Sequence, residues 1–365
     1  MSANNEQTDY ENMLLWTALS FMKGLSPKAL SALAREKELD PASVWLEVCR
    51  IQTDAPDKEV KLPSLDKVRK FIETQEKTCR LLTPSQEDYP QRLLDLEIIP
   101  TVLYVKGSKK LNFSNGLAVV GSRAANAYGR DIAFDLSRQL SKYGMTVISG
   151  LARGIDTCAH RGALEGHGST VAITGCGIDV CYPSENTRLS LAIAETGAVV
   201  SEYPGHSPPM AYKFPHRNRI IAALSTGVLI VQAPYKSGAM ITADLAASLG
   251  RQVMAVPGQV GQPQSEGPLE LLASGASLVR SAQDVLDALG VFYSQLSLDL
   301  PKSCALNDTE RRILEILSEG DRSTGMIADL ADLSSGLIAA SLHALELQGL
   351  IRRQNNLTWH KIGES

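Results

Sequence analysis

The chain has 365 residues, of which 44% are hydrophobic and 21% charged, and its formal net charge is −4. This length allows two or three domains, and the composition is that of a globular protein. No apolar run of about 18 residues and no signal-peptide pattern is present, so we expect a cytoplasmic protein without a membrane segment. An acidic balance leaves a nucleic-acid partner open, because a local basic patch is sufficient for binding.

Residues 1–82 have the pattern of a small helical domain. Ser26-Pro27 is typical of a helix start, because serine caps free N–H groups and proline has none to satisfy. Helical patterns run on either side of it and again over residues 41–48. This helix–Gly-Leu-Ser–helix order resembles SAM-like or helix-hairpin-helix modules, which bind either DNA or other proteins. Both readings stay open.

Residues 83–293 have the alternating pattern of a Rossmann-like parallel sheet. After an apolar strand over 101–105, six short apolar runs occur at 117–120, 146–148, 170–173, 198–200, 228–231 and 252–256. Helical patterns separate most of them. Continuous Val and Ile runs are expected where helices cover both faces of a sheet. Ligands bind beyond the carboxyl ends of such strands, so the residues after each run are the candidate site.

Small, hydroxyl and basic residues follow these runs. Glycine lets the backbone approach an anion, and basic side chains add attraction. Residues 201–251 hold five Lys or Arg and two acids, a local charge of +3. The sequence therefore predicts a phosphate-binding edge whose candidates are Gly121, Ser122, Arg123, Gly150, Arg153, Gly154, Lys236, Ser237, Gly238 and Thr242.

A second basic cluster lies at the amino end of a predicted helix, where Pro215 suits the first turn. Residues at i+3, i+4 and i+7 from Arg217 are apolar and indicate a buried face. The amino end of a helix favours anions, and guanidinium groups strengthen that preference. An alternative pairing of these arginines with acids carries less weight, because Glu202 is the only acid between positions 196 and 243. The candidates here are Lys213, Phe214, Arg217, Asn218 and Arg219.

The usual nucleotide and metal patterns are missing. Neither G-x-G-x-x-G nor G-x-x-x-x-G-K-[ST] follows a predicted strand, and the six cysteines form no C-x-x-C pair. Asp156 and His160 lie one helical turn apart without an accompanying nucleophile. We expect Asp156 to cap its helix and His160 to pack on it. The sequence thus predicts no catalytic residues, no metal and no other cofactor.

The C-terminal residues 307–365 follow a looser linker at 294–306. Three helical patterns at 310–317, 324–331 and 337–348 precede a hairpin with Asn355-Asn356 at its turn, which is the order of a winged helix-turn-helix. This segment holds six Lys or Arg and nine Asp or Glu, whereas a reader of duplex DNA should be basic. We therefore expect this segment to bind another protein or to have a regulatory role.

Several motifs together resemble the DprA/Smf family, the DNA processing protein A proteins. They are Val120–Arg123, Ser149–Asp156, Tyr182-Pro183-x-x-Asn186, Ser201–Gly205, Phe214–Ala222, Ser237-Gly238-x-x-Ile241-Thr242-Ala243 and Val256–Gly258, in order over about residues 83–290. The resemblance implies a homodimer that binds and protects single-stranded DNA and loads RecA recombinase during natural transformation, without enzymatic activity. Further competence or single-strand-binding proteins are candidate partners. It also implies that Phe214 stacks on bases and that Lys213 and Lys236 add positive charge. The phosphate contacts that it implies come from Gly121, Ser122, Arg123, Arg217, Asn218, Arg219, Ser237 and Gly238.

Departures from the family pattern keep alternatives open. Ser237-Gly238-Ala239 stands where relatives commonly have Ser-Gly-Ser, and Gly267-Pro268 where they have Gly-x-Asn. One alternative is an enzyme resembling the nucleotide phosphoribohydrolases, although their Pro-Gly-Gly-x-Gly-Thr motif is replaced by Pro257-Gly258-Gln259 here. A protein scaffold with a vestigial pocket is the third hypothesis.

Overall fold

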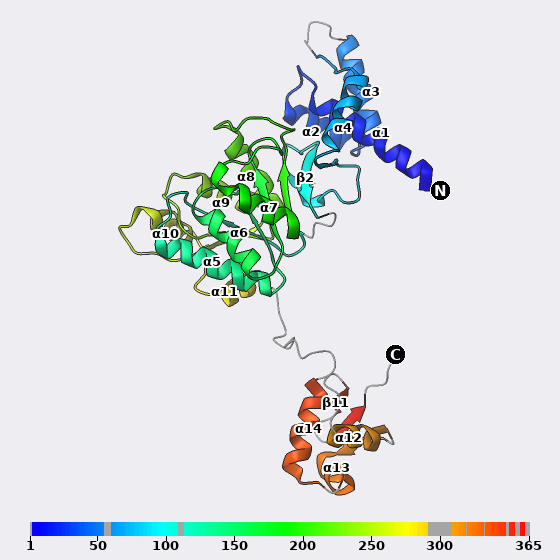
Figure 1. Ribbon diagram of the computed structural model, residues 1–365, viewed down its shortest axis with the longest axis vertical. Helices are drawn as coiled ribbons and strands as arrows, with labels where there is room; N and C mark the ends of the chain where they lie inside the picture. Colours follow the sequence, from blue (N-terminus) through cyan, green and yellow to red (C-terminus); the bar gives the residue numbers. More distant parts are fainter. Residues whose placement is uncertain are drawn as a thin grey trace. The chain divides into compact units, whose positions relative to one another are not determined.

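The protein divides into two compact units, Met1–Val291 and Phe292–Ser365, in a computed structural model (Figure 1). The structure describes residues 2–54, 60–108, 113–290, 308–318, 320–331, 333–347, 350–354 and 358–361. The predicted linker at 294–306 and the predicted turn at 355–356 lie outside these residues. No helix among the described residues is long and apolar enough to span a bilayer.

Four helices precede the sheet, and they belong to the same unit as the sheet. They are α1 (Ser2–Ser20), α2 (Pro27–Glu36), α3 (Pro41–Asp54) and α4 (Leu65–Gln75). Ser26 caps α2 as predicted, since its hydroxyl accepts the Ala29 N–H at 3.2 Å. Leu14 of α1 and Ile72 of α4 are buried in one apolar cluster with Tyr104 of the sheet.

The sheet of the larger unit has nine strands in the order β1-β2-β6-β5-β4-β3-β7-β8-β9. The six predicted apolar runs are β3 to β8, and all six are parallel. β2 contains most of the predicted 101–105 strand, but it runs antiparallel to β6. The strands are β1 (Arg80–Leu82), β2 (Leu103–Gly107), β3 (Gly116–Val120), β4 (Thr146–Ser149), β5 (Thr170–Thr174), β6 (Ala198–Ser201), β7 (Gly227–Ile230), β8 (Gln252–Ala255) and β9 (Ser277–Leu278).

Alternating side chains of each strand enter the cores on opposite faces. Leu117 and Val119 of β3 pack with α5 (Ala127–Lys142), α6 (Ile155–Glu165) and α11 (Ala282–Ala288). Ala118 and Val120 pack with α8 (Lys213–Leu224) and α9 (Gly238–Ser248). Burial on both faces explains the continuous apolar runs in the sequence. The remaining elements are α7 (Thr187–Thr196), α10 (Glu266–Ala273), η1 (Gln91–Asp95), η2 (Ser184–Asn186) and η3 (Pro263–Ser265).

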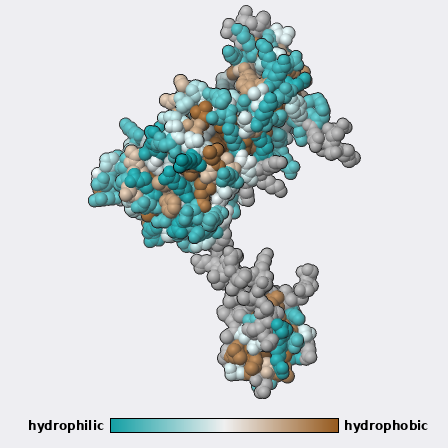
Figure 2. All heavy atoms as spheres, viewed as in Figure 1, coloured by the Kyte–Doolittle hydropathy of each residue, from teal (hydrophilic) through white to brown (hydrophobic). Residues whose placement is uncertain are grey.

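The smaller unit has a core of its own. Its elements are α12 (Asp308–Ser318), β10 (Arg322–Ser323), α13 (Thr324–Ala331), α14 (Ser335–Leu347), β11 (Ile351–Gln354) and β12 (Thr358–Lys361). The helices coincide with the predicted ones within two residues, and the strands form an antiparallel sheet in the order β10-β12-β11. Ile313, Leu342 and Trp359 are buried together. Figure 2 also shows apolar atoms on the surface of this unit, where Met326 and Leu330 are 57% and 55% exposed.

Candidate functional site

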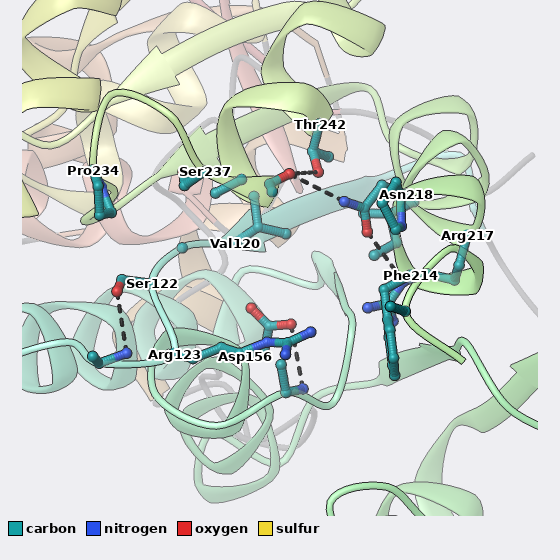
Figure 3. Close-up of a pocket in the computed structure, with 18 of the residues that line it drawn as sticks. Val120, Ser122, Arg123, Asp156, Phe214, Arg217, Asn218, Pro234, Ser237 and Thr242 are labelled. Carbon is teal, nitrogen blue, oxygen red and sulfur yellow. Dashed lines mark hydrogen bonds between the residues drawn. The ribbon is translucent and has the colours of Figure 1, made fainter. Parts of the chain in front are cut away.

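A cleft of about 680 Å³ opens at the carboxyl ends of β3 and β7 (Figure 3). The chain adds β4, β5 and β6 on one side of β3 and then crosses to add β7 and β8 on the other. Loops diverge at such a reversal of strand order, which leaves a crevice. The cleft wall takes residues from the loop after β3, from α6, from α8 and from the start of α9.

Three of the predicted site glycines bring the loops around the cleft into direct contact. A Cβ on Gly150 would lie 2.5 Å from the Arg217 guanidinium, and a Cβ on Gly154 would overlap with the Ser122 carbonyl. Gly154 also has a φ of +76°, which L side chains rarely adopt. The Ser122 N–H donates to the Gln232 carbonyl at 2.6 Å, so it is already used. Gly121 likewise leaves room for the Gln232 carbonyl.

Arg217 lies beneath the cleft and is only 4% exposed. Its Nη1 donates to the carbonyl of Gly150 at 2.8 Å and to that of Ile173. Burial lowers the pKa of Arg217 to about 10, against the opposing charge of Asp156. Pro215 lies in the first turn of α8 as predicted, because α8 begins at Lys213. Arg217 therefore lies in the second turn of α8, and its donors are turned to the loops rather than to the amino end of the helix.

Asp156 is the buried carboxylate beside Arg217. It accepts the N–H of Gly150 at 3.1 Å and that of Ala152 at 3.4 Å. Burial raises its pKa, while the charge of Arg217 opposes the rise. We expected Asp156 to cap α6, but Gly154 is the capping residue and Asp156 lies in the first turn. Its carboxylate instead bonds to the backbone of the preceding loop. His160 packs in the core as expected.

Arg219 and Lys213 are bound within the protein as well. Arg219 donates to both carboxylate oxygens of Glu202, at 2.5 and 2.7 Å. The sequence analysis gave less weight to an ion pair between these arginines and an acid, but Arg219 forms this ion pair with Glu202. Burial raises the pKa of Glu202, but hydrogen bonds and charge from His216 and Arg219 outweigh it and the net shift is downward. Lys213 Nζ donates to Ser207 Oγ at 2.7 Å and to the Pro208 carbonyl at 2.8 Å.

Arg123 is an exposed cation at the cleft. Its guanidinium carbon lies 5.1 Å from the ring centroid of Phe214, within the range of a cation–π contact. Lys236 is also exposed, and among the described residues neither side chain pairs with a carboxylate. Arg153 is exposed too, but it forms an ion pair with Glu185. Arg123 and Lys236 are thus the predicted cations most available to an anion.

The amino end of α9 forms the other wall of the cleft. Ser237 is its capping residue, yet within the described residues its buried hydroxyl has no hydrogen-bond partner. Asn218 Nδ2 donates to the Gly238 carbonyl at 3.1 Å and ties α8 to α9, and Thr242 Oγ1 donates to the same carbonyl from within α9 at 3.2 Å. The first N–H groups of a helix have no partner within it, and the helix dipole attracts anions there. This helix start is therefore suited to a phosphate.

Tyr182 belongs to the site, although the sequence analysis placed it only in a family motif and not among the candidate site residues. It lines the cleft, and its ring centroid lies 5.5 Å from that of Phe214. The signal in the sequence was an aromatic residue in the loop after β5, at the same sheet edge as the other candidates.

A Rossmann-like sheet with a basic and aromatic cleft at the reversal of strand order defines a class of phosphate-binding α/β proteins. Within that class, residues 80–290 match the family described as DNA recombination-mediator protein A. The chain belongs to this family, the DprA/Smf proteins that its motifs resemble.

Individual relatives agree with this assignment. Protein Smf of Escherichia coli K12 is 39% identical over 279 residues, which is 74% of each chain. The X-ray structure of DprA from Streptococcus pneumoniae is 34% identical with a TM-score of 0.58, over 70% of this chain and 86% of that one. DprA from Helicobacter pylori is 32% identical with a TM-score of 0.52, over 57% of this chain and 95% of that one. The H. pylori structure is described as revealing the single-stranded DNA binding mode of that protein.

Proposed function

We propose that this protein binds single-stranded DNA in the cleft and acts as a recombination mediator. The observation that carries the proposal is the exposed Arg123 guanidinium beside the rings of Phe214 and Tyr182, opposite the open start of α9. Stacking on an aromatic ring accepts any base, and a cation next to it holds the backbone. The single-stranded DNA bound by the H. pylori relative supports the same ligand here.

The predicted site residues divide into three roles in this proposal: phosphate contact, base stacking and shaping of the cleft. Arg123, Lys236, Ser237 and Gly238 contact phosphates, and Phe214 contributes to base stacking. The others shape the cleft: Gly121, Ser122, Gly150, Arg153, Gly154, Lys213, Arg217, Asn218, Arg219 and Thr242 hold its loops and helices together. Arg217→Ala is thus a poor probe of binding, because it would leave buried carbonyls and Asp156 without their partner.

The domain organisation and the partners are part of the same proposal. Residues 1–82 form a SAM-like domain, 83–293 the Rossmann-like domain and 307–365 a winged helix. We propose that the homodimer protects incoming DNA in the cytoplasm and loads RecA onto it during natural transformation. Exposed apolar side chains on α9 and the edge strand β9, Ile241 and Leu278, suit an interface between copies.

We further propose that the winged helix docks a protein. Residues 307–365 carry a charge of −3, which opposes contact with a duplex backbone. The exposed Met326 and Leu330 lie one turn apart on α13, as expected for a face that packs against a partner. RecA and further competence or single-strand-binding proteins are the candidates.

Titration of labelled oligonucleotides, single strand against duplex at several salt concentrations, tests the DNA-binding proposal. We expect Arg123→Ala to weaken single-strand binding about tenfold whatever the base sequence, and to lower the slope of log K against log salt by about 0.7 for each lost phosphate contact. Lys142→Ala removes one charge at the opposite edge of the sheet, where α5 ends, and should leave binding unchanged.

Two results would contradict the proposal. One is that the wild-type protein binds no oligonucleotide at low salt, which would favour a scaffold with a vestigial pocket. The other is release of free base from a nucleotide monophosphate, which would favour the phosphoribohydrolase alternative.

A further inference from the structure

Tyr182 is held in place by a well-anchored loop, yet its side chain is 40% exposed. The loop is fixed by Asn186, which is 3% exposed and donates to the Leu151 carbonyl and to Thr157 Oγ1, both at 2.9 Å. An exposed ring on a fixed backbone loses little conformational freedom when a ligand stacks on it. Tyr182 thus has the properties of a stacking platform.

Phe214, by contrast, has neighbours on several sides. The backbone of Gly175 is so close that a Cβ there would lie 2.8 Å from Cδ1 of the ring. The Arg123 guanidinium lies over the ring, and Tyr182 lies beside it at a tilt of 41°. A base could stack on the face of Phe214 that Arg123 covers only after Arg123 has moved.

The gap between the two rings is too narrow to admit a base. Their centroids are 5.5 Å apart, whereas a base between them requires about 7 Å, twice the contact distance of roughly 3.5 Å between carbon atoms. A base must therefore stack on the outer side of one of the two rings, and Tyr182 is the more exposed of the two.

We propose that Tyr182 is the outer nucleobase-stacking residue of the cleft, with Phe214 packed beside its ring and Arg123 packed on Phe214. The inference rests on the proposed function, because it specifies how the bases of a single strand are held. Arg123 then serves two neighbours: its guanidinium packs on Phe214 and remains available to the phosphate next to the stacked base. The subsite accepts any base, since every base has a π face.

Binding of the full-length protein to two ligands of equal length tests this inference: an oligothymidylate and an abasic deoxyribose-phosphate chain. We expect Tyr182→Ala to weaken oligothymidylate binding about fivefold to a hundredfold and to leave abasic binding within about twofold. Tyr182→Phe keeps the ring and should bind like the wild type. Tyr143→Ala is the matched control, because Tyr143 is 39% exposed at the opposite sheet edge, just after α5.

A 2-aminopurine base in the oligonucleotide reports stacking directly. Its fluorescence should be quenched on binding to the wild type and to Tyr182→Phe, but not on binding to Tyr182→Ala. Equal losses for both ligands in Tyr182→Ala would mean that the ring acts structurally. Unchanged oligothymidylate binding in Tyr182→Ala together with loss in Phe214→Leu would place the base on Phe214. Either result would reject the role of Tyr182 but leave the proposed DNA-binding function intact. A wild-type protein that binds neither ligand would reject both the role of Tyr182 and the proposed function.

Discussion

Arg123 and Arg217 line the same cleft, but their guanidinium groups have different surroundings. Arg217 donates to two loop carbonyls and is buried, so moving it to a ligand would leave those carbonyls without a donor. Arg123 is exposed and packs on Phe214, a contact that a phosphate can replace at small cost. The guanidinium of Arg217 therefore supports the fold, whereas that of Arg123 is available to a ligand.

His160 shows how a buried neighbour fixes a tautomer. Thr170 Oγ1 donates to the Val147 carbonyl at 2.7 Å, so it can only accept from His160 Nδ1 at 2.8 Å. The ring proton of neutral His160 is thus on Nδ1, and Nε2 is a buried atom without a partner in the described structure. A second proton on Nε2 would create a buried, unsatisfied cation. Burial accordingly lowers the pKa of His160 to about 3.

His160 should make stability depend on pH in the acidic range. Its ordinary pKa is 6.5 and the folded value is lower, so the stabilising contribution is fully present above pH 6.5 and is lost as the pH falls from 6.5 towards 3. Within that range, His160 changes the free energy of unfolding by about 1.4 kcal/mol per pH unit. Urea unfolding at a series of pH values should show a weaker pH dependence for His160→Gln, whereas His206→Gln, at an exposed position, should follow the wild type. Parallel curves for all three proteins would refute the assignment.

Among the secondary-structure elements, α8 has a different environment on each flank. On one flank Arg219 and Lys213 bond to Glu202 and to the loop after β6. On the other flank Phe214 and Asn218 face the cleft, and Asn218 holds the start of α9. α8 thus contacts the loop after β6 on one flank and the start of α9 on the other. The shape of the cleft therefore depends on contacts between elements that are distant in the sequence.

Gly154 joins the loops after β3 and β4, and its replacement should disturb both. Gly154→Ala should lower the free energy of unfolding for two reasons. A positive φ costs an L residue about 1–2 kcal/mol, and overlap of the new Cβ with the Ser122 carbonyl costs a further ~1–3 kcal/mol. Gly250→Ala is the control, because Gly250 has a φ of +66° and no atom within 4 Å of its would-be Cβ. Urea unfolding should show the larger loss of stability for Gly154→Ala, which should also bind single strands less tightly. Equal losses in the two variants would mean that the loop contact is unimportant.

The two compact units have separate apolar cores, and the cleft residues all belong to the larger one. Charge is divided in the same way. Residues 201–251 carry +3, whereas residues 307–365 carry −3. Under the proposed function, the attraction of a nucleic acid would therefore come from residues 201–251 of the larger unit.

A chain that ends at Gly290 should accordingly fold and bind single-stranded DNA as tightly as the full-length protein, or slightly more tightly, because a segment of charge −3 has been removed. Oligonucleotide titration at low salt, with circular dichroism to confirm folding, checks this expectation. A loss of affinity of about tenfold or more in a folded fragment would show that the smaller unit contributes to DNA binding.

Much of the architecture could be predicted from the sequence. The runs that became β3 to β8 are continuous because both of their faces are buried, and Ser26-Pro27 begins α2 through chemistry local to two residues. The direction of β2 could not be predicted, since an apolar run does not specify whether its neighbour is parallel. Pro215 was placed correctly in the first turn of α8, but the partners of Arg217 and Arg219 could not be predicted, because they lie on other elements.

The sequence by itself determined the alternation of strands and helices, the edge of the sheet that carries the site, and the family. Only the tertiary structure decided which of the basic residues face the cleft and which hold the fold. Arg217 meets the Gly150 carbonyl across 67 positions of sequence, Arg219 meets Glu202 across 17, and Tyr182 meets Phe214 from a different loop. Burial and hydrogen-bond partners depend on such distant contacts, and residue type alone does not specify them.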